Sequence, residues 1–298
     1  MTERESGPAD LGPSPKWSRP RSTGSSLCSS SSGSTGTCSA PRSRCRPTPA
    51  ASSAARWPLK RSRAATHTVE VDHHPHSLHG YFLRPGSPET PVLLHVDRIR
   101  DGRSFTTRTV VAIQEGEAIF ELIASFHRDE PATEYQVPPP DGVPKPDSDT
   151  LWHESPISRF SLASPFEMRE MANPGPDERG LLSSTRRVWL RTRGALPDDR
   201  ALHACVITFV SDMGAVFAAA LAVGGGLGIT MGASLDHAVW FHRPIRPDEW
   251  MLFDLWPVSN AGSRGLVHGT MHAGDGLLGA SVAQEALIRF VQSPTTAT

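Results

Sequence analysis

The chain has 298 residues, of which 38% are hydrophobic, so it can form one large domain or two ordinary ones. Its net charge of −1 gives no reason to expect nucleic acid as a partner, and no stretch holds the roughly 20 consecutive apolar residues that a membrane-spanning helix needs. The four cysteines follow neither a disulfide nor a zinc pattern. We therefore expect a reduced, cytoplasmic protein.

Residues 1–66 have a composition of their own. They contain 11 Lys or Arg against 3 Asp or Glu, and no Ile, Val, Phe or Tyr. Such a segment cannot bury enough apolar surface to offset the entropy lost on ordering, so we predict that it is disordered. Two origins fit this composition: a disordered tail fused to a truncated protein, or GC-rich coding DNA read out of frame. We favour the reading-frame error.

Strand patterns begin after residue 67, in a first unit that we place at 67–130. Residues 76–128 contain four alternating segments, which predict a four-stranded antiparallel meander with a hairpin turn at Glu115-Gly116. Residues 131–182 are rich in proline and acidic side chains, which predicts an exposed linker.

The second unit, residues 183–298, combines strands with one long helix. The segment "RRVWLRTRG" alternates as a strand does, and so do residues 234–242, 249–258, 263–272 and 277–290. Between them lies a helical stripe that starts at Pro197-Asp198-Asp199 and stops at Gly224-Gly225-Gly226. The stripe consists of Leu202, Val206, Phe209, Met213 and Phe217. One apolar helix covering a sheet indicates an α+β fold.

Two short motifs recur at nearly the same spacing. "FLRP", which begins at Phe82, matches "FHRP", which begins at Phe241, at an offset of 159. Glu115-Gly116 matches Asp275-Gly276 at an offset of 160. Chance and common hairpin chemistry are the alternative explanation, but the shared order favours an internal duplication.

Several longer blocks resemble the acyl-CoA thioesterase II (TesB-type) family. They are "SLHGYFLRPG", "VDRIRDGRSFTTRTVVAIQEGEAIFELIASF", "SLDHAVWFHRP" and "RGLVHGTMHAGDGLLGASVAQEALIR", within residues 73–290. The resemblance implies a double hot-dog fold, with two antiparallel sheets that each pack on a long helix, and hydrolysis of acyl-CoA to free acid and CoA without a cofactor. Residues 1–66 lack the first helix of that pattern, so we expect an incomplete first hot dog whose sheet exposes an apolar face.

The resemblance also implies a catalytic trio of Asp212, Ser234 and Gln284. A carboxylate can act as general base on a water, while a hydroxyl and a carboxamide can hold that water and the developing oxyanion. By residue type alone, Asp212 could instead bond a neighbouring backbone group, and Ser234 could be an ordinary strand-edge hydroxyl. Gln284 interrupts an apolar strand where the first repeat has Ala124, so its burial requires a bonding partner.

Two further residues are candidates for substrate contact. His76 matches a histidine that the family places near its first strand, and Arg243 could bind the CoA phosphates. For Arg243 we favour a structural role as a strand-end arginine, paired with an acid such as Asp248 or Glu249. The run "HHPHSLH" lacks the spacing of a metal site, so we expect no metal.

Three functions are consistent with the sequence. The favoured one is a fatty acyl-CoA thioesterase, expected to be a homo-oligomer with acyl-CoA as its partner. The others are a non-catalytic acyl-CoA-binding hot dog and a damaged, inactive product.

Overall fold

The computed structural model describes residues 64–148, 165–171, 185–223 and 229–290. The predictions of disorder and of a missing first helix concern residues that lie mostly outside these ranges. Residues 64–66 are described, and they are helical, with the Ala65 side chain fully buried in the core. The predicted boundary at residue 66 is therefore too late by at least these three residues.

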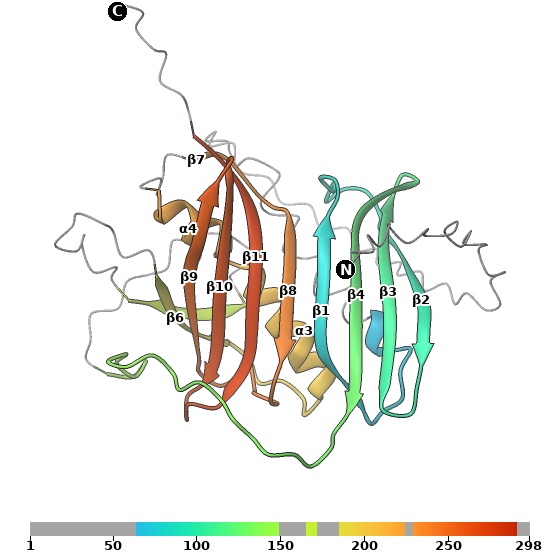
Figure 1. The fold of residues 1–298 in the computed structure, drawn as a ribbon, viewed down its shortest axis with the longest axis horizontal. Helices are drawn as coiled ribbons and strands as arrows, with labels where there is room; N and C mark the ends of the chain where they lie inside the picture. The colour runs from blue at the N-terminus through green and yellow to red at the C-terminus, as the bar shows by residue number, and fades with distance from the viewer. Residues whose placement is uncertain (1–63, 149–164, 172–184, 224–228, 291–298) are drawn as a thin grey trace, which may run out of the picture.

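In the described part of the chain, eleven strands form a single antiparallel sheet (Figure 1). Its order is β2-β3-β4-β1-β8-β11-β10-β9-β6-β5, and β7 pairs with β11 beside this path. The first unit supplies β1 (His73–Phe82), β2 (Leu93–Asp101), β3 (Phe105–Gln114) and β4 (Glu117–Arg128). The second supplies β5 (Phe166–Glu170), β6 (Arg186–Thr192), β7 (Ile229–Ser234), β8 (Asp236–Phe241), β9 (Met251–Ala261), β10 (Arg264–Ala273) and β11 (Leu278–Phe290).

The order of the first four strands differs from the predicted meander. β2, β3 and β4 are neighbours in sequence order, but β1 pairs with β4 and β8 instead of β2. The physical reason is that β1 closes the gap between the two units: its outer edge is occupied by β8, so residues 83–92 must carry the chain back to the far edge. The result is one sheet continuous across both repeats.

The seam between β1 and β8 demonstrates the duplication. His79 pairs with Ala238, and 238 − 79 = 159 is the repeat offset itself. Leu78 pairs with Val239, and Gly80 pairs with His237. The same offset relates Leu78 to His237 and Gly80 to Val239, so each of these two pairs is the repeat equivalent of the other. A pseudo-two-fold axis therefore passes between His79 and Ala238. The strand order is symmetric about it: β1, β4, β3 and β2 correspond to β8, β11, β10 and β9.

The two Arg-Pro motifs lie at equivalent ends of these strands, as predicted. The backbone N–H groups of Leu83 and Arg84 both donate to the carbonyl of Ile119. Those of His242 and Arg243 both donate to the carbonyl of Gly279, which is the equivalent bond in the second repeat. Proline after the arginine has no N–H to continue the ladder, so both strands end there.

The predicted long helix is two helices, α3 (Arg200–Asp212) and α4 (Ala215–Leu221). Asp199 caps the start of α3 by accepting hydrogen bonds from the N–H groups of Ala201 and Leu202, at 3.0 and 3.1 Å. The break follows Asp212, because Gly214 takes a left-handed conformation with φ of 105°. The predicted stop at residues 224–226 lies outside the described ranges.

Both helices pack on the same sheet. α3 contacts β1, β8 and β11, and α4 contacts β7, β9, β10 and β11. Residues Arg200–Leu221 together are long and apolar enough to cross a membrane, yet 78% of the apolar window is buried inside the protein, as expected of a core helix. In the first repeat, Val110, Leu122 and Phe126 are at most 1% exposed, so the predicted exposed apolar face is wrong.

Residues 131–182 are not simply a linker. Most side chains of residues 129–148 are exposed, as predicted, but residues 166–170 form β5, which pairs with β6 at the edge of the sheet. The division of the chain at 131 and 182 itself remains a prediction.

Candidate active site

Asp212, Ser234 and Gln284 meet at one carboxylate oxygen. Ser234 Oγ donates to Asp212 Oδ1 at 3.2 Å, and Gln284 Nε2 donates to the same oxygen at 2.9 Å. Gln284 Nε2 also donates to Ser234 Oγ at 2.7 Å. Asp212 and Gln284 are 7% and 1% exposed. The structure thus brings all three predicted residues together in a nearly dry setting.

Three elements supply these side chains. Asp212 is the last residue of α3, and the left-handed Gly214 ends the helix directly after it. Ser234 is the last residue of β7, where it pairs with Ala286 of β11. Gln284 lies two residues before Ala286 on that strand, so its side chain shares a face with the register partner of Ser234. The helix break and the β7–β11 pairing therefore set the geometry of the trio.

The polar cluster extends to two residues that the sequence analysis missed. His237 Nδ1 lies 2.7 Å from Gln284 Oε1, and His237 Nε2 lies 2.9 Å from Ser211 Oγ. Ser211 Oγ is also 3.1 Å from the carbonyl oxygen of Thr208. The sequence carries little signal for His237, because an alternating strand does not by itself say which of its faces is buried.

Burial governs the charge of His237. Its side chain is 2% exposed, and this loss of hydration lowers the pKa of the imidazole below the ordinary value of 6.5. Asp212 and Asp236 and the hydrogen bond with Gln284 act in the opposite direction, but more weakly. The ring is therefore neutral at physiological pH.

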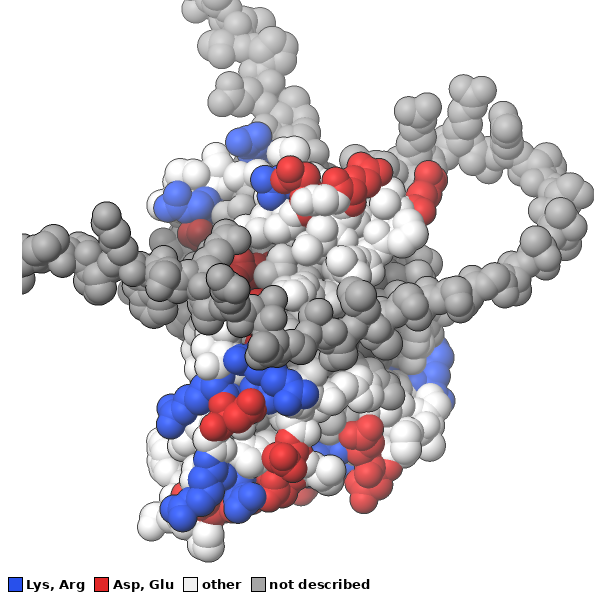
Figure 2. Space-filling view, turned by 90° about the vertical axis from the view of Figure 1, so that its right-hand side faces the viewer, with Lys and Arg blue, Asp and Glu red and all other residues white. Residues whose placement is uncertain are grey.

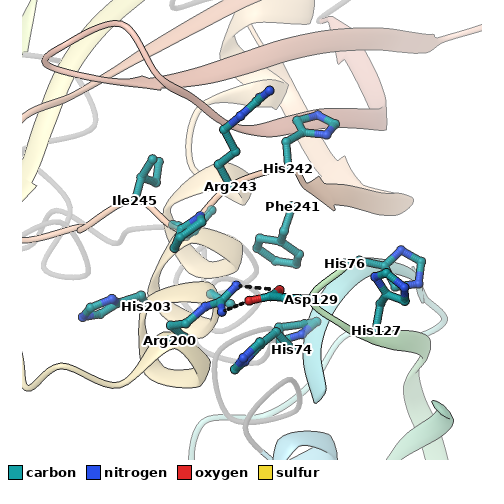
Figure 3. Close-up of a pocket in the computed structure, with 14 residues that line it drawn as sticks. His74, His76, His127, Asp129, Arg200, His203, Phe241, His242, Arg243 and Ile245 are labelled. Carbon is teal, nitrogen blue, oxygen red and sulfur yellow. Dashed lines mark hydrogen bonds and ion pairs between the residues drawn. The ribbon is translucent and has the colours of Figure 1, made fainter. Parts of the chain in front are cut away.

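His76 and Arg243, the two predicted substrate contacts, lie in a different place. Both line a cavity of about 170 Å³ at the seam, alongside the first two turns of α3 (Figure 3). The cavity is rich in histidine and arginine; its lining includes His74, His76, His127, Arg200, His203, His242 and Arg243. Asp212 is not part of the lining, and Ile207 is the lining residue nearest to it in sequence. The cavity and the trio are thus separate features.

Arg243 pairs with an acid, but not with either predicted one. Its Nε donates to Glu134 Oε2 at 3.0 Å. Asp248 instead binds Arg246, whose Nη2 lies 2.9 Å from Asp248 Oδ2. The reason is position: Arg243 follows the end of β8 and lies beside residues 134 and 135, whereas Arg246 comes three residues later and lies on the side of Asp248.

His76 is also engaged within the protein. Its Nε2 lies 2.8 Å from Ser125 Oγ, and its ring meets Phe105 edge-on with centroids 5.6 Å apart. Partial burial and the neighbouring His127 lower the pKa of His76. Contact with substrate stays a prediction for both His76 and Arg243.

Comparison with known proteins identifies the family. The model of the acyl-CoA thioesterase N-terminal domain matches residues 62–127, and that of the C-terminal domain matches residues 138–288. Mouse acyl-coenzyme A thioesterase 8 is 38% identical over 247 residues, which are 76% of this chain and 77% of the mouse protein. The chain belongs to the acyl-CoA thioesterase family.

Two bacterial relatives of this thioesterase give the same result. Acyl-CoA thioesterase 2 of Haemophilus influenzae is 32% identical over 240 residues, covering 76% of this chain and 84% of the relative. The crystal structure of acyl-CoA thioesterase II TesB2 from Mycobacterium marinum superposes with a TM-score of 0.67 and 34% identity, over 80% of this chain and 89% of that one. The predicted family and the double hot-dog fold are confirmed, and the thioesterase is a thioester hydrolase that acts on acyl-CoA.

Proposed function

We propose that this thioesterase hydrolyses fatty acyl-CoA to a free fatty acid and CoA, using a water that Asp212 activates and that Ser234 and Gln284 hold. The observation that carries the proposal is the meeting of these three side chains, from a helix and two strands, around one buried carboxylate oxygen. Burying three polar groups is costly unless they bond to one another, and here they do.

The proposed reaction proceeds by direct attack of water. Asp212 Oδ1 accepts the bonds from Ser234 and Gln284, while Oδ2 has no hydrogen-bond partner among the described residues. Oδ2 is therefore the oxygen that takes a proton from the attacking water. The water oxygen bonds to the thioester carbonyl carbon, the C–S bond then breaks, and the proton held by Asp212 passes to the departing CoA thiolate. Water and thioester are converted to acid and thiol without a covalent enzyme intermediate.

Ser234 and Gln284 contribute by orienting the Asp212 carboxylate. Their donor groups face the same carboxylate oxygen, so they fix the orientation of Asp212 before substrate arrives. Held in this way, the Asp212 carboxylate can take the proton from the water without having to reorganise. A buried carboxylate that keeps Oδ2 without a partner among the described residues supports turnover over the alternative of a hot dog that only binds acyl-CoA.

The test is Asp212→Asn, assayed by CoA release with a thiol reagent on a series of saturated acyl-CoA substrates. Asparagine keeps an acceptor for Ser234 and Gln284 but cannot take a proton, so kcat should fall by about 10²–10⁴-fold. Asp199→Asn is the matched control at the other end of α3, because asparagine caps a helix as well as aspartate does. Wild-type turnover in a folded Asp212→Asn protein would exclude Asp212 as the base. A wild-type protein that binds acyl-CoA without releasing CoA would favour the non-catalytic alternative.

A further inference from the structure

The hydrogen bonds around Asp212 fix the orientation of the Gln284 amide, and the inference drawn from that orientation rests on the function proposed above. A carboxylate oxygen only accepts hydrogen bonds, so both groups that approach Asp212 Oδ1 must donate. Gln284 must therefore present its NH₂ group to Asp212 and Ser234. Its carbonyl oxygen, Oε1, must then point the other way, towards the ring of His237.

The orientation of Gln284 determines the tautomer of His237. Oε1 is an acceptor, so His237 Nδ1, at 2.7 Å, must carry a hydrogen. In the neutral ring Nε2 is then an acceptor, and the hydroxyl of Ser211, at 2.9 Å, donates to it. With the opposite tautomer, Gln284 would have to flip and bring its carbonyl oxygen against Asp212 Oδ1. The Nδ1–H bond of His237 is therefore what keeps the amide in the useful orientation.

This orientation is independent of the charge of His237. A protonated ring would still donate from Nδ1, and Ser211 could then accept from Nε2 while donating to the carbonyl of Thr208 at 3.1 Å. The charged groups that act on the ring are Asp212 of α3 and Asp236 of its own strand. Neither reverses the direction of the Nδ1–H bond.

The first repeat shows that the fold does not need these polar residues. The pseudo-two-fold axis makes Leu78 the equivalent of His237 and Ala124 the equivalent of Gln284. Leu78 and Ala124 are buried in register with each other, at 4% and 3% exposure. Hydrocarbon therefore packs well at these positions, and the polar pair occurs in the repeat that contributes Asp212 and Ser234.

We propose that His237 is a positioning residue of the hydrolytic site, which holds the Gln284 carboxamide by its Nδ1–H bond so that the amide NH₂ faces Asp212 and Ser234. His237 does not touch the substrate or the reacting water. It acts through Gln284, and Ser211 in turn holds the outer nitrogen of the ring.

The first test compares His237→Leu with His237→Asn. Leucine is the residue of the first repeat and has no donor, whereas the side-chain amide nitrogen of asparagine occupies the place of Nδ1 and can donate to Gln284. We expect His237→Leu to lower kcat by about 10²-fold, the usual effect of a small misplacement of a reacting group, with KM changed less than about threefold. His237→Asn should recover most of that loss. Equal losses in the two variants would overturn the proposal.

A double-mutant cycle tests whether His237 acts through Gln284. If it does, His237→Leu should have little further effect on kcat in a Gln284→Ala background, because the group that it positions is gone. Multiplicative losses in the double variant would show that His237 acts on its own and would overturn the proposal. His272→Leu is the control, since His272, like His237, is buried, but it lies outside the cluster, with its Nε2 3.3 Å from the carbonyl oxygen of Val137.

A readout without substrate separates this proposal from the proposed reaction. The side-chain NH₂ signals of Gln284, assigned by their absence in Gln284→Ala, should be sharp and slow to exchange with solvent in the wild type. They should broaden or exchange rapidly in His237→Leu and return in His237→Asn. Unchanged signals in His237→Leu would refute the positioning role whatever the rate of turnover. Conversely, the signals could be lost in His237→Leu while Asp212→Asn keeps full activity. That pair of results would refute the proposed reaction and leave the positioning role of His237 intact.

Discussion

At the scale of single residues, Gln284 connects the buried imidazole to the carboxylate, because one end of its amide accepts and the other donates twice. Gln284→Ala removes all three bonds but leaves a side chain that the first repeat accommodates as Ala124. We expect kcat to fall by about 10²-fold, the usual effect of a small misplacement of a reacting group, because Asp212 loses a donor that orients it, with KM within a few-fold of wild type. Steady-state kinetics of CoA release measures both. An effect confined to KM would make Gln284 a binding residue only.

The buried His237 also makes stability depend on pH. Its pKa is lowered by burial in the folded state and returns to about 6.5 on unfolding. Below pH 6.5 the unfolded chain therefore binds a proton that the folded chain does not, so stability falls as pH decreases towards the folded pKa and is complete above 6.5. The slope in that window reaches about 1.4 kcal/mol per pH unit for one proton.

Urea unfolding at several pH values between 5 and 8 checks this dependence. The slope below pH 6.5 should be shallower in His237→Asn, which has no group that titrates there, than in the wild type. His76 and His272, whose pKa values are lowered mainly by burial, contribute in the same direction in both proteins. An unchanged slope in His237→Asn would contradict the assignment of a neutral, buried ring.

Sequence reasoning found some of these residues and not others for a physical reason. Gln284 stands out because a carboxamide in an apolar strand must have a partner. His237 sits in an alternating strand and could face either side, and no local pattern tells that its ring meets an amide 47 positions later. The partner of Arg243 was wrong for a related reason, since Glu134 lies 109 positions away in a segment without a predicted structure.

At the scale of elements, the break between α3 and α4 places Asp212 at a helix end. Gly214 has a φ of 105°, a conformation that costs an L-residue about 1–2 kcal/mol. Gly214→Ala should therefore destabilise the fold by about that amount and lower kcat, because relief of the strain would move Asp212. Urea unfolding and kinetics of the same variant measure the two effects. A stable variant with full activity would mean that the break does not determine the position of Asp212.

The sequence predicted where most helices and strands lie along the chain. It predicted less well where they begin and end and which strands pair. The helical stripe predicted the whole apolar segment, but the break depends on one glycine in a left-handed conformation, which periodicity does not reveal. The short strand β5 was missed because residues 166–170 lie among prolines and charges and become a strand only by pairing with β6. The pairing of β1 with β4 and β8 is a long-range choice that no local pattern encodes.

At the scale of the whole molecule, β1 is the strand that joins the repeats, because it pairs with β8 on one side and packs tightly against β4 on the other. Gly80 lies opposite His237 on the β1–β8 seam, and a Cβ at Gly80 would stand 2.5 Å from Phe120 Cζ and 3.1 Å from the carbonyl oxygen of Glu121. We expect Gly80→Ala to destabilise the protein by about 1–3 kcal/mol, because the buried Phe120 ring has to move.

Gly194→Ala is the matched control for that variant, since a Cβ there has nothing within 4 Å and needs no special backbone conformation. Urea unfolding of both variants measures the difference. If Gly80→Ala were as stable as Gly194→Ala, β1 would be less tightly packed against β4 than these distances indicate.

The outer edge of the first repeat is charged. Strand β2 carries two acidic and two basic residues in the run "VDRIRD", and Figure 2, which faces that side of the molecule, shows side chains of both signs interspersed over the described residues. Charges along an exposed edge discourage addition of further strands. The expected homo-oligomer therefore has to use another surface, and light scattering at several protein concentrations tests whether it forms.

The pseudo-two-fold symmetry also bears on the number of hydrolytic centres in one chain, and therefore on how many substrates the chain can turn over at once. Duplication of a unit would give two related hydrolytic centres, yet the first repeat has Leu78 and Ala124 where the second has His237 and Gln284. Titration with a slowly released substrate analogue should therefore saturate at one equivalent per polypeptide. Building a second centre would require at least Leu78→His and Ala124→Gln together, because either polar group alone would be buried without its partner.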